Sequence, residues 1–267
     1  MKKYTQVMKM NFQIELSYKW NLILTSLMDI FRVVAEIALW KILLDSTPIN
    51  TISGYNINSI ITYYIFIFVI GTVTDASNIG RKIANDIKEG VLNNLIIRPI
   101  NYIGYYFSEV LAQKFVRLII AIITFIPVFI IQASNICISI NSLQLLLFPL
   151  VLLLSLVINF FLNVVISLLV FWITEVTSLF FFKDILLDFL SGRAFPIDLL
   201  PIWIFNAFQA LPFMYCTFFP INVLTKGMVD GEFFKGILMQ IIWISILYII
   251  IKLLWKFGIK KYAGTGG

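Results

Sequence analysis

Histidine is absent from this chain of 267 residues, and cysteine occurs only twice. The lack of histidine excludes zinc sites that need imidazole ligands, Ser-His-Asp and Cys-His nucleophile systems, and imidazole proton shuttles. The phosphate-binding pattern G-x-x-x-x-G-K-[ST] is missing as well, so the chain cannot bind and hydrolyse ATP by that means. The sequence therefore predicts a protein that is not itself an enzyme.

Charge is also scarce, because charged residues make up 13% of the chain and hydrophobic residues 60%. Soluble domains average roughly 25% charged and about 45–50% apolar residues. A domain of this length still exposes much of its surface, so the apolar surplus must face lipid. The composition predicts an all-α membrane protein with a single transmembrane domain over residues 1–267.

The basic residues outnumber the acidic ones by 20 to 14. They do not form one basic stripe with interleaved aromatic side chains, which argues against nucleic acid as a partner. They gather instead in particular loops, which the positive-inside rule for membrane proteins explains better.

Long uncharged runs are the units to count, because a helix needs about 20 apolar residues to cross the hydrocarbon of a bilayer. The sequence contains six such runs. They cover about residues 21–44, 57–74, 104–131, 145–172, 178–190 and 233–255. The fourth is long enough to tilt. The fifth is the least clear, because Lys183, Asp184 and Asp188 lie inside it.

The orientation follows from the loops. If six spans alternate, 14 of the 20 basic residues lie on one side. They are Lys2, Lys3, Lys9, Lys19, Arg81, Lys82, Lys88, Arg98, Lys114, Arg117, Lys252, Lys256, Lys260 and Lys261. The opposite loops, 45–58 and 132–141, contain no Lys or Arg. The positive-inside rule therefore places both termini in the cytoplasm.

Residues 78–90, between the second and third runs, have the spacing of an amphipathic helix that Gly90 is suited to end. The apolar face holds Ile79, Ile83, Ala84 and Ile87, and the polar face holds Arg81, Lys82, Asn85, Lys88 and Glu89. A short cytoplasmic helix of this kind can lie on the bilayer surface or dock a soluble partner. The polar segment before residue 21 is expected to form an amphipathic N-terminal arm.

Residues 195–220 carry four prolines in a stretch that stays rich in Leu, Phe and Trp. The prolines are Pro196, Pro201, Pro212 and Pro220, and Trp203 lies among them. Prolines at this density break a spanning helix into short pieces, and aromatic side chains favour the membrane interface. The pattern predicts a re-entrant element in the outer leaflet. Cys137 and Cys216 fall on this outer side, which leaves a disulfide open, although a single pair does not indicate one.

Ionisable residues inside the runs are the candidate functional positions, because charges are costly at the bilayer centre and usually serve a function there. In the first run Asp29, Arg32 and Glu36 are spaced by three and four residues, so they share one helical face. Arg32, between two carboxylates, can be neutralised and hydrogen-bonded within its own helix. The stripe thus has two interpretations, helix packing and a lining of the transport pathway.

In the fifth run Asp184 and Asp188 share a face one turn apart. Like charges repel, so one of the two carboxyls can hold a proton at neutral pH. Acid and base catalysis would need a nucleophile or a metal, and none accompanies the pair. Helix packing and a polar patch on the pathway therefore come before catalysis. Glu109, Lys114 and Arg117 are expected to snorkel to the headgroups as anchors.

Several short motifs follow one another along the chain. They are residues 17–21 (SYKWN), 54–55 (GY), 87–100 (IKEGVLNNLIIRPI), 191–192 (SG), 196–203 (PIDLLPIW), 211–213 (LPF), Pro220 and 261–264 (KYAG). With them the chain resembles the permease subunits of type-two ATP-binding-cassette (ABC) exporters, in particular a bacterial branch whose members have six spans and little else. The resemblance covers nearly the whole chain. Each motif alone is weak, and the order of all the motifs along the chain makes the resemblance specific.

The resemblance implies roles for particular segments. A coupling helix that contacts a cytosolic ATPase would include Ile83, Ala84, Ile87, Lys88, Glu89 and Gly90. The turn back to the third span would hold Leu92, Leu95, Arg98 and Pro99. The outer re-entrant element would run from Pro196 to Pro212.

The resemblance also implies an assembly in the bacterial cytoplasmic membrane. Two permeases, identical or homologous, would work with two copies of an ABC ATPase subunit, and ATP and Mg²⁺ would bind in that partner rather than in this chain. The pathway would lie between the permeases and be lined by the first, second and fifth helices. ATP-driven closure of the two ATPase subunits would push on the coupling helices and shift the pore between inward-open and outward-open states. It can do so only if the contacts of the coupling helix differ between these two states.

Two other classes of function compete with this interpretation. An ion- or proton-coupled carrier would use the intramembrane carboxylates, but it would favour inverted repeats, and no convincing repeat relates the two halves. A membrane enzyme acting on lipids would need a nucleophile motif, which is not seen. The substrate is left open, since an apolar and aromatic pathway suits peptides, lipids or other amphiphiles, and the family also exports antibiotics.

Overall fold

The computed structural model describes residues 2–46, 51–52, 54–96, 101–173 and 175–263. These residues are largely helical, and their only extended pairing is an isolated bridge between Ile52 and Tyr55. The α-helices are α1 (Lys2–Ser17), α2 (Lys19–Asp45), α3 (Ile57–Thr74), α4 (Ser77–Lys88), α5 (Asn93–Ile96), α6 (Tyr102–Gln132), α7 (Ser142–Leu168), α8 (Thr177–Leu190), α9 (Ile202–Gln209), α10 (Phe218–Thr225) and α11 (Asp230–Ala263). Short 3-10 helices η1 (Ala133–Asn135), η2 (Leu169–Phe171), η3 (Ile197–Leu199) and η4 (Phe213–Cys216) lie between them.

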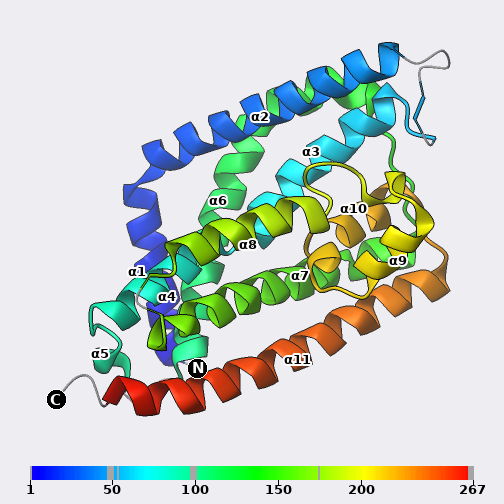
Figure 1. Ribbon diagram of the computed structural model, residues 1–267. Coiled ribbons are helices and arrows are strands. Elements are labelled where there is room, and N and C mark those ends of the chain that lie inside the picture. Colours follow the sequence, from blue (N-terminus) through cyan, green and yellow to red (C-terminus); the bar gives the residue numbers. More distant parts are fainter. Residues whose placement is uncertain (1, 47–50, 53, 97–100, 174, 264–267) are drawn as a thin grey trace.

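The helices run between two ends of an elongated bundle, and both termini lie at the same end (Figure 1). This terminal end is held together by aromatic contacts. The ring of Tyr102 stacks on Trp255 with centroids 3.7 Å apart, and Tyr262 packs against Phe171. The start of α6, the end of α7 and the end of α11 therefore meet there.

The opposite end, here called the loop end, holds the connections between helices and the short elements α9 and α10 (Figure 1). Asn141, which caps α7, donates a hydrogen bond to Asp230 at the start of α11. The backbone N–H of Ser139 bonds to the carbonyl of Leu224 at 2.9 Å. The chain crosses from one end of the bundle to the other, and back again, along α2, α3, α6, α7, α8 and α11 in turn.

These six helices coincide with the six predicted runs, but they do not all have the properties of a membrane span. Four helical stretches are long and apolar enough to cross a membrane, namely Ile57–Lys88, Tyr102–Asn135, Ser142–Phe171 and Asp230–Tyr262. Charged residues interrupt the apolar sequence of α2, and α8 has only 14 residues. The described residues thus contain four candidate spans by length and composition, and the count of six stays a prediction.

Helix α11 extends well beyond the run predicted for it. The run ends at Trp255, whereas the helix continues to Ala263 and contains 34 residues, which corresponds to a length of about 50 Å. The last two turns carry lysines, so hydropathy alone ends the segment too early. The additional turns bring Tyr262 onto Phe171.

The N-terminal arm is a helix that packs along the first half of α6. A Cβ on Gly104 would lie within 3.3 Å of the Tyr4 ring, so the glycine permits this close approach. Further along, the ring of Phe12 lies 6.0 Å from that of Phe115. Helix α1 and the start of α6 therefore run side by side in the same direction.

Gly236 of α11 allows close packing against the rest of the bundle. A Cβ on Gly236 would overlap the ring of Phe219, which is 2% exposed. Gly231 on the same helix has no atom within 4 Å of such a Cβ.

We expect Gly236→Ala to lower the apparent midpoint of thermal unfolding in detergent, because overpacking a buried contact costs about 1–3 kcal/mol. Gly231→Ala is the matched control and should leave the midpoint unchanged or raise it slightly, since alanine favours the helix. Equal midpoints for both variants would show that α11 does not pack on Phe219.

Candidate functional site

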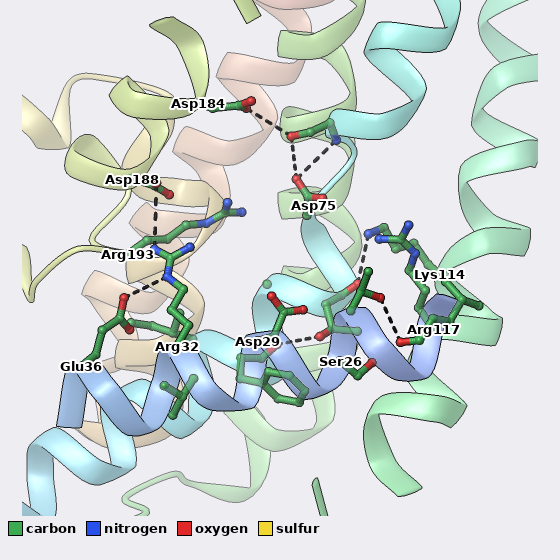
Figure 2. Close-up of a pocket in the computed structure, with 18 residues that line it drawn as sticks. Ser26, Asp29, Arg32, Glu36, Asp75, Lys114, Arg117, Asp184, Asp188 and Arg193 are labelled. Carbon is green, nitrogen blue, oxygen red and sulfur yellow. Dashed lines mark hydrogen bonds and ion pairs between the residues drawn. The ribbon is translucent and has the colours of Figure 1, made fainter. Parts of the chain in front are cut away.

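A cavity of about 310 Å³ lies between α2, α3, α6 and α8 (Figure 2). Five carboxylates and four basic groups line it. The charged lining residues are Asp29, Arg32, Glu36, Asp75, Lys114, Arg117, Asp184, Asp188 and Arg193. Within the described ranges no group of three or more Asp, Glu or Cys side chains is arranged to hold a metal ion.

The cavity brings together the two charged stripes that the sequence predicts separately. Nε of Arg32 lies 2.9 Å from Oε1 of Glu36, one turn along α2. The same guanidinium lies 3.9 Å from the carboxylate of Asp188 on α8. Asp29 points into the same space (Figure 2). Arg32 therefore joins α2 to α8 and the stripe lines a cavity, while a place on a transport pathway stays a prediction.

The expected repulsion between Asp184 and Asp188 is not seen, because each carboxylate has its own cation. Asp184 lies 2.6 Å from Arg81 of α4 and 2.6 Å from the adjacent Lys183. Asp188 faces Arg32. Sequence alone cannot supply this result, since the compensating charges come from helices distant in the chain.

The ammonium of Lys183 is the most deeply buried charge of this region, with 3% of the residue exposed. It donates to Oγ of Ser77 at 3.1 Å and to Oδ1 of Asn163 at 2.9 Å. Together with Asp184, these groups use all three of its N–H donors. Lys183 thus joins α8 to the start of α4 and to α7.

Helix α7 carries a polar stripe that the sequence reading did not single out. Ser155, Asn159, Asn163 and Ser167 follow at intervals of four residues, and all four are 0% exposed. Each contacts a different partner segment. Ser155 donates to the carbonyl of Tyr215, Asn159 accepts from the N–H of Ala76, and Ser167 donates to the carbonyl of Gly80. The spacing of four inside the apolar run 145–172 is the signal that could have revealed it.

The interpretation of Glu109 and Lys114 as snorkelling anchors is wrong. Glu109 is 2% exposed and its carboxylate lies 2.5 Å from the Lys82 ammonium. Lys114 is 8% exposed and donates to the carbonyl of Thr72 at 3.1 Å. Both side chains point inward because α3 and α4 supply partners there. Arg117, the third predicted anchor, lines the cavity.

Asp75 and Arg193 are cavity residues that the sequence reading missed. Asp75 follows α3 and accepts a hydrogen bond from the Ser77 hydroxyl at 2.7 Å. It also interacts electrostatically with Lys114 and Arg193. Arg193 follows the end of α8 and donates through Nε to Thr217. Both lie at the edges of apolar runs, where hydropathy assigns them to loops.

The amphipathic segment 78–90 is helical as α4, but its apolar face points into the bundle. Ile83, Ala84 and Ile87 are 1–3% exposed, so in this structure they cannot contact another chain. The stripe on α7 and the bundle core already cover them. The exposed residues of α4 and its end are Asn78, Arg81, Asn85, Lys88 and Glu89. A contact with a partner has to use this polar face.

The end of α4 contacts the segment that precedes α8. Lys88 lies 3.8 Å from the carboxylate of Glu175. Hydrogen bonds from Thr177 lower the pKa of Glu175, so this exposed carboxylate stays ionised beside Lys88. Gly90 has a φ of +77°, which suits glycine at the end of a helix. In the turn that follows, Leu92 and Leu95 are buried, whereas Arg98 and Pro99 lie outside the described residues.

The proline-rich segment forms short elements, and the proline positions mark their starts. Pro196 precedes η3, Pro201 precedes α9 and Pro212 precedes η4, while Trp203 is 71% exposed.

Two tyrosines of α3 hold the chain between α8 and these elements. The hydroxyl of Tyr63 donates to the carbonyl of Gly192 at 2.6 Å, and that of Tyr64 to the carbonyl of Ala194 at 2.8 Å. Nearby, Asp198 accepts a hydrogen bond from Tyr55 and forms an ion pair with Lys226. Cys137 is exposed and Cys216 is buried, and both are free thiols, so the disulfide left open above does not form.

The fold defines a multi-pass helical membrane protein with a charged cavity between its helices. The family model described as ABC-2 family transporter protein matches residues 30–266. The chain belongs to this family and is therefore a membrane permease component of an ABC transporter. A search of curated protein sequences found no match.

We expect Lys183→Met to lower stability by roughly 1–3 kcal/mol, because Asn163 and Ser77 would lose a charged hydrogen-bond partner in the interior. Lys41→Met is the control, since Lys41 is exposed on α2. The readout is the apparent unfolding midpoint of the purified protein in detergent. A midpoint for Lys183→Met equal to that of the control would contradict the role of the buried ammonium.

Proposed function

We propose that the chain is the permease subunit of an ABC exporter in which two permeases, identical or related, assemble with two cytosolic ATPase subunits. The observation that supports this most is the charged cavity between α2, α3, α6 and α8. The ATPases would supply the ATP and Mg²⁺ sites, and this chain would bind no cofactor.

The cavity opens on a face that lipid would cover poorly. The side chain of Arg32, in the middle of α2, is 54% exposed, and that of Asp188, in the last turn of α8, is 38% exposed. Charged groups in contact with lipid at this depth cost several kcal/mol. A second permease on the α2 and α8 face would remove that contact and would place the export pathway between the two chains.

The terminal end is the proposed cytoplasmic side. Both termini, α4 and the lysine-rich end of α11 lie there (Figure 1), which agrees with the positive-inside rule. An ATPase would contact the exposed polar face of α4 around Asn85, Lys88 and Glu89. Movement of α4 would reach the cavity through the Arg81 and Asp184 ion pair.

The alternative is an ion- or proton-coupled carrier that uses the cavity carboxylates. Glu36, Asp184 and Asp188 each face a cation of the same chain, so the ion pairs within the chain already engage these carboxylates. Together with the family assignment, this favours the ATP-driven permease.

We expect Asn85→Trp to reduce the amount of ATPase that co-purifies with the tagged permease at least fivefold, because a bulky ring would interrupt the contact on α4. Asn206→Trp is the matched control, since Asn206 is equally exposed but lies on α9 at the loop end. Loss of the ATPase with Asn206→Trp but not with Asn85→Trp would place the contact at the loop end and would contradict the contact proposed on α4.

The position of the second permease is tested by crosslinking in membranes, for the case of two identical chains. In a Cys137→Ser background, a cysteine at Phe181, which is 67% exposed on α8, should give a crosslinked dimer. A cysteine at Ile123, which is 65% exposed on α6, should not. Crosslinking from Ile123 alone would move the interface to α6.

A further inference from the structure

Two guanidinium groups of the cavity have an unused N–H donor. Nε of Arg117 and Nη2 of Arg193 are buried and have no hydrogen-bond partner among the described residues. Lys114 lies within electrostatic reach of both arginines. Unpaired buried donors are costly, and arginine is well suited to a phosphate or carboxylate group. The α6 side of the cavity therefore provides a basic wall formed by Lys114 and Arg117 (Figure 2).

The opposite side of the cavity is acidic. Asp29 and Glu36 from α2 and Asp188 from α8 project there, and Arg32 and Arg193 lie among them (Figure 2). Three carboxylates beside two guanidinium groups leave one negative charge available for a second cation. An ammonium group can use it, because carboxylates accept hydrogen bonds from N–H donors at several positions.

A ligand with a single charge would satisfy only one of these walls. An anion would pair with Lys114 and Arg117 but would be repelled by the carboxylates. A cation would pair with the carboxylates but would be repelled by Lys114 and Arg117. A group that carries an anionic and an ammonium function is complementary to both. The volume of about 310 Å³ is at the lower limit for small-molecule sites, so it suits a headgroup rather than a whole lipid.

Helices α2 and α8, which line the cavity, also carry large exposed apolar side chains. Met28 on α2 is 70% exposed and Phe181 on α8 is 67% exposed. An alkyl chain attached to the bound headgroup would contact the apolar surface of these helices, where contact with hydrocarbon is favourable.

We infer that the cavity binds the zwitterionic headgroup of an amphiphile, with the anionic group at Lys114 and Arg117 and the ammonium at Asp29, Glu36 and Asp188. The inference rests on the proposed function in treating the cavity as part of the export pathway. It adds the chemical class of the cargo.

The test measures binding of tail-labelled fluorescent alkyl probes to the purified chain in maltoside micelles by fluorescence anisotropy. The probes share one chain length and carry a phosphocholine, a carboxylate betaine, a sulfate or a trimethylammonium group. We expect at least one zwitterionic probe to bind about tenfold more tightly than the sulfate and the trimethylammonium probes. The phosphocholine and betaine arms distinguish a phosphate from a carboxylate as the anionic group.

Variants assign the binding to the two walls. Arg117→Gln and Glu36→Gln should each weaken zwitterion binding about tenfold, whereas Lys41→Gln, on the exposed face of α2, should leave it unchanged. If Arg117→Gln does not fold, Arg117→Lys serves instead, because it keeps the charge and removes the Nε donor. The affinity of Arg117→Lys for the zwitterionic probe should lie between that of the wild type and that of Lys114→Gln, which removes a charge from the same wall.

Three outcomes would overturn the inference. In the first, no probe binds saturably. In the second, a singly charged probe binds as tightly as the zwitterionic probes, and in the third, Glu36→Gln leaves zwitterion binding unchanged. The assay needs no ATPase, so it is independent of the co-purification experiment. Zwitterion binding without an associated ATPase would reject the proposed function alone, and an associated ATPase without zwitterion binding would reject the cargo class alone.

Discussion

The placement of the Lys183 ammonium is the constraint on which the arrangement around the cavity depends. An ammonium inside an apolar bundle is stable only where a carboxylate and hydrogen-bond acceptors surround it. Lys183 finds them in Asp184, Ser77 and Asn163, which belong to three different segments. Helix α8 therefore cannot slide along α4 and α7 without losing one of these contacts. Because α8 carries Asp188 to Arg32, the same constraint sets the position of α2.

The polar stripe of α7 extends this constraint along the bundle. Its four side chains bond to η4, α11, α4 and α8, so one buried helix makes directional contacts with most of its neighbours. Apolar contacts between membrane helices are weakly directional, because lipid tails are as apolar as the side chains. Serine and asparagine at a spacing of one turn supply the direction. Gly80 adds to it, because a Cβ there would overlap Asn163.

Hydropathy predicts the helical runs well, because a lipid-facing segment has to be apolar over its whole length. It fails where contacts within the protein replace lipid. Helix α11 continues through Lys260 because aromatic rings hold its last turns. The cavity was predictable only in part. Spacing shows that Asp29, Arg32 and Glu36 share a face, but pairing with Asp188 depends on tertiary packing. For segment 78–90 the periodicity identifies two faces correctly and does not tell which one is buried.

The ion pair between Arg32 and Asp188 has a consequence for biosynthesis. At translation rates of about 5–20 residues per second, α8 leaves the ribosome roughly 10–30 s after α2. During that interval the first helix has to stay in the bilayer without its eventual partner. Glu36, one turn away on the same helix, can neutralise the guanidinium in the meantime, so the local pair acts as a temporary counterion until the protein completes its own tertiary contacts.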